Sequence, residues 1–249
     1  MKRLLLFSRI VLLILLFANI TFSQNYWDYP VKPGTKEWKS LNTIQEIIAV
    51  QQIPENLLQK MTTEELFQAW MDLPGRLDVL AFNTMQRGFD VTIERYNVLP
   101  VLLARRDVGP VALERYFQIN PSDMRNDWSS GKKGQFITDI GFIEFLISQP
   151  SVLNTLPKPE KKLIAKSILD NIVKKQTVIE EDRDLFWEES SVILLGRILQ
   201  NEGYDKFILR IAQKPNLERS LERGEIILLG EDINIYEDVI NIAEDYLSE

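Results

Sequence analysis

Apolar residues that recur in steps of three and four are the feature that most constrains the fold of this chain. Ile164, Ile168 and Ile172 advance in steps of four, and apolar residues between Ile235 and Tyr246 advance by four, three and four. These steps match the period of an α-helix, whereas the alternating apolar and polar runs of strands are lacking. Prolines and glycines interrupt the stripes at short intervals. The sequence therefore predicts an all-α fold, an irregular helical bundle or a short α-solenoid of about ten short helices.

Several local signals predict where these helices begin and end. Asn42 or Thr43 can cap one helix, and the segment from Thr62 to Glu65 resembles a capping box in front of the next. Pro100 is expected to kink or split the apolar segment 90–106, and Gly109-Pro110 to interrupt the chain again.

One predicted helix, Glu160 to Lys175, has two faces of different character. The apolar face is expected to hold Leu163, Ile164, Ile168, Ile172 and Val173. A basic stripe that begins just before this helix consists of Lys158, Lys161, Lys162, Lys166, Lys174 and Lys175. Because lysine is almost never fully buried unless it is paired, we interpret the stripe as a solvated face. A docking surface for an acidic partner is the alternative interpretation.

The domain organisation is predicted from the loop-forming residues between the two halves. Residues 119–135 are rich in Asn, Asp, Ser and Gly, which makes this stretch a predicted loop or linker. It separates an N-terminal arm and helical subdomain, 24–118, from a C-terminal helical subdomain, 136–249. The arm holds Tyr26, Trp27 and Tyr29, whose rings are expected to pin it to the body by burial. A platform on which a ligand stacks is the alternative interpretation of these three aromatics.

The first 23 residues have the pattern of a secretory signal peptide. Lys2 and Arg3 precede a short apolar stretch, and small residues lead to a predicted cleavage between Ser23 and Gln24. A membrane anchor would need about 20 apolar residues, and the stretch from Ile10 to Phe22 is only 13 residues long and includes Asn19 and Thr21. The sequence thus predicts a protein exported across the inner membrane to the periplasm, the cell surface or the medium, with no transmembrane segment in its mature chain.

Composition excludes several kinds of chemistry. The chain has no Cys and no His, so it offers neither a thiolate nor an imidazole as nucleophile, base or metal ligand. Loss of the signal peptide reduces the 29 basic residues to 26 against 36 acidic residues, a formal net charge of −10. Such an acidic chain is not expected to bind nucleic acid, whose phosphates attract basic surfaces. Without disulfides, the stability of the mature chain must come from its core.

Several segments of the first half resemble a family of exported bacterial proteins. The resemblance rests on the segment Tyr29–Trp38, which reads YPVKPGTKEW, then on QIPE at 52–55 and MTTEEL at 61–66, and continues to Tyr116. It covers residues 29–117 and fades in the second half. The family has no assigned activity, so the resemblance implies export and an all-helical body and assigns no catalytic residue.

Paired carboxylates are the first catalytic option that remains without His and Cys, because glycoside hydrolysis can use two acids alone. Asp90 and Glu94 are four residues apart and would share a helix face. A denser acidic group contains Glu180, Glu181, Asp182, Asp184, Glu188 and Glu189. A solvated acidic surface, paired with Arg87, Arg95 or Arg183, explains both sets more simply.

Two further options have weaker support. Asp182-x-Asp184 and Asp232-x-Asn234 resemble the start of a calcium loop, but both lack the glycine at its sixth position and the glutamate at its twelfth. Ser167 beside Lys166 or Lys162 could form a Ser–Lys nucleophile, although Ser167 is not part of a Ser-x-x-Lys motif. We therefore assign no catalytic residue, no metal site and no cofactor, and leave the binding residues unassigned.

The sequence favours an exported, non-enzymatic binding or scaffolding protein. Its expected partner is a protein or a component of the cell envelope, because stacked amphipathic helices present extended surfaces. The alternative hypothesis is a carboxylate-dependent hydrolase that acts on glycans or peptidoglycan. That hypothesis requires a cleft that holds two acids, one of them with a raised pKa.

Overall fold

The computed structural model describes residues 27–178, 185–226 and 234–249, and every regular element in these ranges is helical. The all-α prediction is confirmed. The α-helices are α2 (Lys36–Lys39), α3 (Ile44–Ala49), α4 (Glu55–Leu58), α5 (Thr63–Met71), α6 (Met85–Arg95), α7 (Val98–Leu103), α8 (Val108–Phe117), α9 (Ser130–Ile147), α10 (Pro150–Leu153), α11 (Lys158–Val178), α12 (Leu185–Asn201), α13 (Asp205–Gln213), α14 (Pro215–Arg223) and α15 (Ile235–Ser248). Two 3-10 helices are η1 (Pro74–Ala81) and η2 (Pro121–Asp123).

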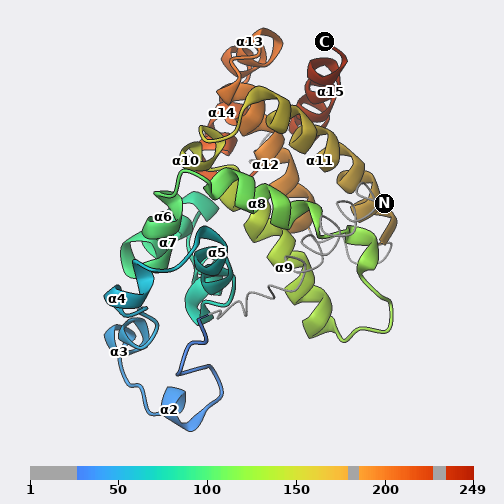
Figure 1. The fold of residues 1–249 in the computed structure, drawn as a ribbon. Coiled ribbons are helices and arrows are strands. Elements are labelled where there is room, and N and C mark those ends of the chain that lie inside the picture. The colour runs from blue at the N-terminus through green and yellow to red at the C-terminus, as the bar shows by residue number, and fades with distance from the viewer. Residues whose placement is uncertain (1–26, 179–184, 227–233) are drawn as a thin grey trace, which may run out of the picture.

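Helix α9 connects the two halves of the molecule. It packs against α8 on one side and against α12 on the other, and α12 in turn packs against α11 and α15 (Figure 1). The small helices α2 to α4 lie at the opposite end from α13 and α15 (Figure 1). Buried apolar residues from Tyr29 to Tyr246 form one continuous cluster. The irregular bundle is therefore organised around a long helix that is buried along most of its second half.

Helix starts follow the predicted caps. Thr43 caps α3 and Thr62 caps α5, and in both cases a glutamate three residues later completes a capping box. The arm is held as expected at Tyr29, whose side chain is buried and packs edge-on against Trp27 at 6.2 Å between ring centroids. Capping depends on neighbouring residues, whereas the burial of Tyr29 follows from its large apolar ring, and the structure agrees with both predictions.

Three predicted interruptions fall elsewhere. The segment around Pro100 is split at Tyr96 and Asn97, and Pro100 itself lies in the first turn of α7. Helix α8 runs through Gly109-Pro110 because both are in its first turn, where proline loses no helical hydrogen bond. Helix α9 begins at Ser130 with Ser129 as its cap, so the last residues of the predicted loop 119–135 are helical.

The two faces of α11 were predicted wrongly at four positions. Lys161 and Lys175 are buried, whereas the side chains of Leu163 and Val173 are 52% and 61% exposed. Each buried lysine has a carboxylate partner, Glu202 for Lys161 and Glu144 for Lys175. Lys161 is three residues before Ile164 and Lys175 three residues after Ile172, so both lie on the buried face of α11. A paired lysine can occupy such a face.

Candidate functional site

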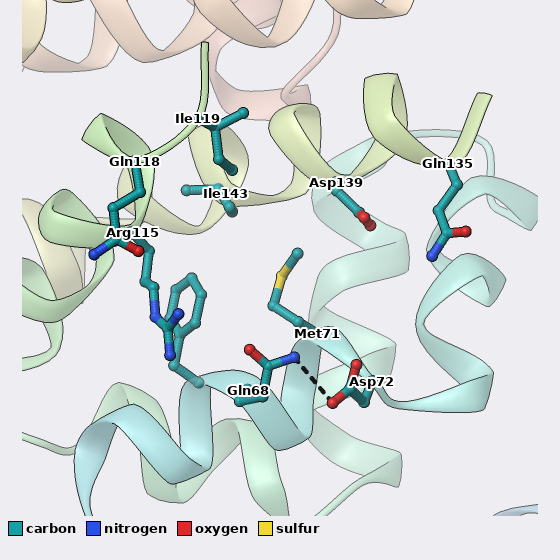
Figure 2. Close-up of a pocket in the computed structure, with 10 residues that line it drawn as sticks. Gln68, Met71, Asp72, Arg115, Gln118, Ile119, Gln135, Asp139 and Ile143 are labelled. Atoms are coloured by element: carbon teal, nitrogen blue, oxygen red, sulfur yellow. Dashed lines mark hydrogen bonds between the residues drawn. The ribbon is translucent and has the colours of Figure 1, made fainter. Parts of the chain in front are cut away.

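A pocket of about 220 Å³ opens between α5, α8 and α9. Helix spacing explains how its walls are built. Gln135, Asp139 and Ile143 follow one another in steps of four and so line one face of α9. The other walls come from α5 and its end (Phe67, Gln68, Met71 and Asp72) and from the end of α8 (Arg115, Gln118 and Ile119). Three helices thus each supply a polar group to the same space (Figure 2).

The polar lining combines amides with charges of both signs. Gln68 Nε2 donates to Asp72 Oδ2 at 2.9 Å, which holds these two side chains together at the end of α5 (Figure 2). Gln118 and Gln135 are exposed at the rim, and an amide can both donate and accept hydrogen bonds. Phe67, Met71 and Ile143 supply apolar surface. The arrangement suits a small ligand that has several polar groups and one apolar face.

Asp139 is the ionisable group most affected by this environment. Burial raises its pKa above the ordinary value of 3.8, and the negative charge of Asp72 acts in the same direction. Arg76 opposes both effects, because its Nη2 donates to Asp139 Oδ1 at 2.5 Å. Arg76 is itself held by the ring of Phe142, 5.0 Å from its guanidinium carbon. The pocket therefore contains one exposed carboxylate, Asp72, and one that is partly buried and paired.

A second polar cluster lies in the core and contains a serine and a lysine in contact. Lys175 Nζ is 3.0 and 3.1 Å from the two oxygens of Glu144 and 2.8 Å from Ser191 Oγ. Ser190 and Ser191 donate to Glu144 at 2.5 and 2.8 Å, and Tyr116 donates at 3.0 Å. Burial lowers the pKa of Lys175, and the charge of Glu144 opposes that shift.

This cluster has the residue types of a Ser–Lys catalytic site, but a substrate could not reach them. Glu144, Lys175, Ser190 and Ser191 are all buried, and none lines either pocket described in this structure. The Ser191 hydroxyl accepts from the ammonium while it donates to the carboxylate, which makes it a bridge within an ion pair. We interpret the cluster as a structural link between α8, α9, α11 and α12.

The catalytic candidates from the sequence do not meet at either place. Asp90 and Glu94 share α6, but Asp90 accepts a hydrogen bond from Gln86 Nε2 at 2.9 Å and Glu94 is exposed. Ser167 lies on α11, and no hydrogen bond to Lys162 or Lys166 is present in the described part of the chain. Lys162 lies over the Tyr246 ring instead, 5.0 Å from its centroid.

Other candidates fall wholly or partly outside the described residues. These are the cleavage position Ser23–Gln24, the acidic residues Glu180, Glu181, Asp182 and Asp184, the residue Arg183, and Asp232. Asn234, the remaining calcium candidate, precedes α15. Within the described ranges, no group of three or more acidic residues is placed to hold a metal ion, and no helix is long and apolar enough to cross a membrane.

Sequence reasoning missed the pocket, since its residues follow no shared motif. Asp72 and Asp139 are far apart in the chain, and each looks like an ordinary surface carboxylate. Sequence reasoning also missed Glu144, although the sequence carries a signal for it: it is a lone charge in the apolar run from Gly141 to Ile147. A lone charge in such a run requires a buried partner.

Comparisons with known proteins add no functional information. No family model, no curated protein and no solved structure matches this chain. The functional argument therefore depends on the site alone.

Proposed function

We propose that this chain is an exported helical binding protein whose pocket between α5, α8 and α9 receives a small polar ligand. The observation that supports binding is the convergence of three glutamine amides, two carboxylates and Arg115 around apolar surface. The pocket volume of about 220 Å³ is smaller than the roughly 300–1,000 Å³ typical of drug-sized ligands. A single sugar ring or one residue of a peptide, presented by a protein or by the cell envelope, fits that size.

Export is a separate part of the proposal. It is supported by the basic and apolar pattern of residues 1–23 and by the resemblance of residues 29–117 to exported proteins. Expression of the full chain in a bacterial host, followed by mass spectrometry of the protein recovered from outside the inner membrane, should give a mature N-terminus at Gln24. An intact Met1 on that protein would contradict the proposed cleavage.

The binding proposal is tested with a panel of probes. N-acetylated monosaccharides, free amino acids and dipeptides would be titrated against the purified protein by ligand-observed NMR. Gln118→Ala and Gln135→Ala remove exposed amides at the pocket rim, so each should weaken binding of any true ligand several-fold. Gln213→Ala removes an exposed amide at the end of α13 and should leave binding unchanged.

Equal effects of the rim variants and the Gln213 variant, or no saturable binding by any probe, would reject the pocket as the binding site. The result would not depend on whether the chain is exported, so the two parts of the proposal can fail separately.

One observation supports the alternative function. Asp72 and Asp139 line the same pocket, and the pKa of Asp139 is raised, which are features of a carboxylate-dependent hydrolase. Incubation of the protein with peptidoglycan and with chitin fragments would release soluble sugars if this were its activity. Loss of that release in both Asp72→Asn and Asp139→Asn would favour the hydrolase, whereas no release by the wild-type protein would reject it for these substrates.

A further inference from the structure

A second pocket lies at the junction of α10, α12 and α14 and does not overlap with the first. Its volume is about 380 Å³, within the usual range for small-molecule sites. Pro150 and Leu153 of α10, Arg197 and Gln200 of α12, and Leu221 and Glu222 of α14 are among the residues that line it. Arg197 and Gln200 are three residues apart on α12 and so lie on the same face of that helix.

Arg197 differs from the other buried cations in the described part of the chain. Arg76, Lys161 and Lys175 each make an ion pair, with Asp139, Glu202 and Glu144 respectively. Arg197 is 8% exposed, and its direct hydrogen-bond partners are all neutral. They are the Leu221 carbonyl at 2.9 and 2.5 Å, Ser148 Oγ at 3.1 Å and Gln86 Oε1 at 2.9 Å.

The charge of Arg197 is therefore buried without an adjacent counter-charge. The nearest carboxylate in this network is Asp90, which is reached only through the Gln86 amide. Burial lowers the pKa of Arg197 to about 10, and Asp90 offsets this only in part. The Phe145 ring centroid lies 5.3 Å from the guanidinium carbon, but a ring carries no net charge. A buried cation without an adjacent anion has a desolvation cost that such an anion would offset.

The guanidinium also retains capacity for one more bond. Arginine has five N–H groups, and four of those of Arg197 donate to the acceptors named above, which leaves one hydrogen on Nη1. A hydrogen bond from guanidinium to carboxylate is about twice as strong as one between neutral groups.

We propose that the pocket at α10, α12 and α14 binds a small ligand through a carboxylate that pairs with Arg197. Gln200 is exposed beside it and can bind a second polar group of the same ligand. Glu222 is exposed on the α14 wall, and its charge disfavours a doubly charged anion such as phosphate. This proposal does not depend on the first pocket or on export.

The probe that tests the proposal is trifluoroacetate, observed by ¹⁹F NMR on the purified protein at constant ionic strength. The wild-type protein should broaden the probe signal in a saturable way, and acetate should displace the probe while inorganic phosphate should not. Stronger displacement by phosphate than by acetate would overturn the assignment to a carboxylate. Absence of saturable broadening would overturn the site as a whole.

Matched variants place the binding at Arg197. Gln200→Glu supplies a carboxylate from the chain itself, so probe affinity should fall at least tenfold without removal of any core contact. Gln213→Glu adds the same charge on α13, away from the pocket, and should leave affinity unchanged. Glu222→Gln should strengthen binding several-fold, since it removes a like charge.

Arg197→Gln provides the direct comparison, but the loss of its four hydrogen bonds endangers the fold. The Gln200→Glu variant keeps the proposal testable even if that protein is unstable. Equal affinity of the Gln200→Glu and Gln213→Glu proteins for trifluoroacetate would show that the probe binds elsewhere.

Discussion

At the scale of single residues, Glu144 and Lys175 hold two opposite charges in the core, with side-chain exposures of 0% and 1%. Removal of one charge leaves the other buried without its partner. We expect Lys175→Met to reduce the free energy of unfolding by about 3–5 kcal/mol, measured by urea denaturation. The double change Glu144→Gln with Lys175→Met should cost less than the single change, because it leaves no net charge.

Lys166→Met provides the control for this prediction, because Lys166 is exposed on the same helix and should change stability by less than about 0.5 kcal/mol. A loss of less than about 1 kcal/mol in the free energy of unfolding of Lys175→Met would show that other groups stabilise the buried charge of Glu144.

Asp139 gives a prediction about pH. Its folded-state pKa is raised, so the folded protein binds this proton more tightly than the unfolded chain does. The contribution of Asp139 to stability is therefore fully present below its ordinary pKa and is lost as the pH rises through the folded-state pKa. Carboxyl ¹³C NMR should show the Asp139 pKa above 3.8. Asp72→Asn should lower that pKa because it removes a neighbouring negative charge.

Asp123→Asn removes an exposed carboxylate on η2, and the titration of Asp139 should be unaffected by it. If both variants shifted the Asp139 pKa equally, the proposed effect of Asp72 across the pocket would be wrong.

At the scale of elements, Gly88 sets the distance between α6 and η1. A Cβ atom at this position would lie 2.1 Å from the backbone oxygen of Val79, and a backbone group cannot rotate away. Gly88→Ala should therefore destabilise the protein by about 3 kcal/mol, at the upper end of the usual cost of overpacking. The measurement is the midpoint of thermal or urea unfolding.

Gly134→Ala makes the same change inside α9, where a Cβ atom would have nothing within 4 Å. That variant should be more stable by about 0.5–1 kcal/mol, since alanine favours a helix interior. If Gly134→Ala lost as much stability as Gly88→Ala, the close approach to Val79 would not be the cause of the loss at Gly88.

At the scale of the whole molecule, an ion pair and side-chain hydrogen bonds join the two halves that the predicted linker separates. Arg76 pairs with Asp139, Gln86 Nε2 donates to Gln149 Oε1 at 3.0 Å, and Arg197 donates to Gln86. The apolar core is also continuous from Tyr29 to Tyr246. We therefore expect one cooperative unfolding transition.

Native-state hydrogen exchange would test this expectation, because the most protected amides of α5 and α12 should open with the same free energy. Separate opening energies for the two helices would favour the two subdomains, 24–118 and 136–249, that the loop-forming residues of 119–135 predict.

The sequence by itself determined the helical class and the cap at Thr62, and it narrowed the cap of α3 to Asn42 or Thr43, because each depends on neighbours within a few residues. It did not determine whether a proline in a first turn breaks a helix or starts one, as Pro110 in α8 shows. The chain before Val108 is not part of α8, so Pro110 falls in the first turn, where it removes no helical hydrogen bond.

Only the tertiary structure decided which charges are buried and which residues share a pocket. The charge pattern predicts a solvated face for Lys161 and Lys175, because it does not show their partners, Glu202 in the turn after α12 and Glu144 on α9. Asp72 and Asp139 line one pocket because α5 packs near α9, and Arg197 lines the other because α12 packs near α10 and α14. Such pairings depend on contacts between residues distant in the chain, whereas helix periodicity reports only which residues share a face.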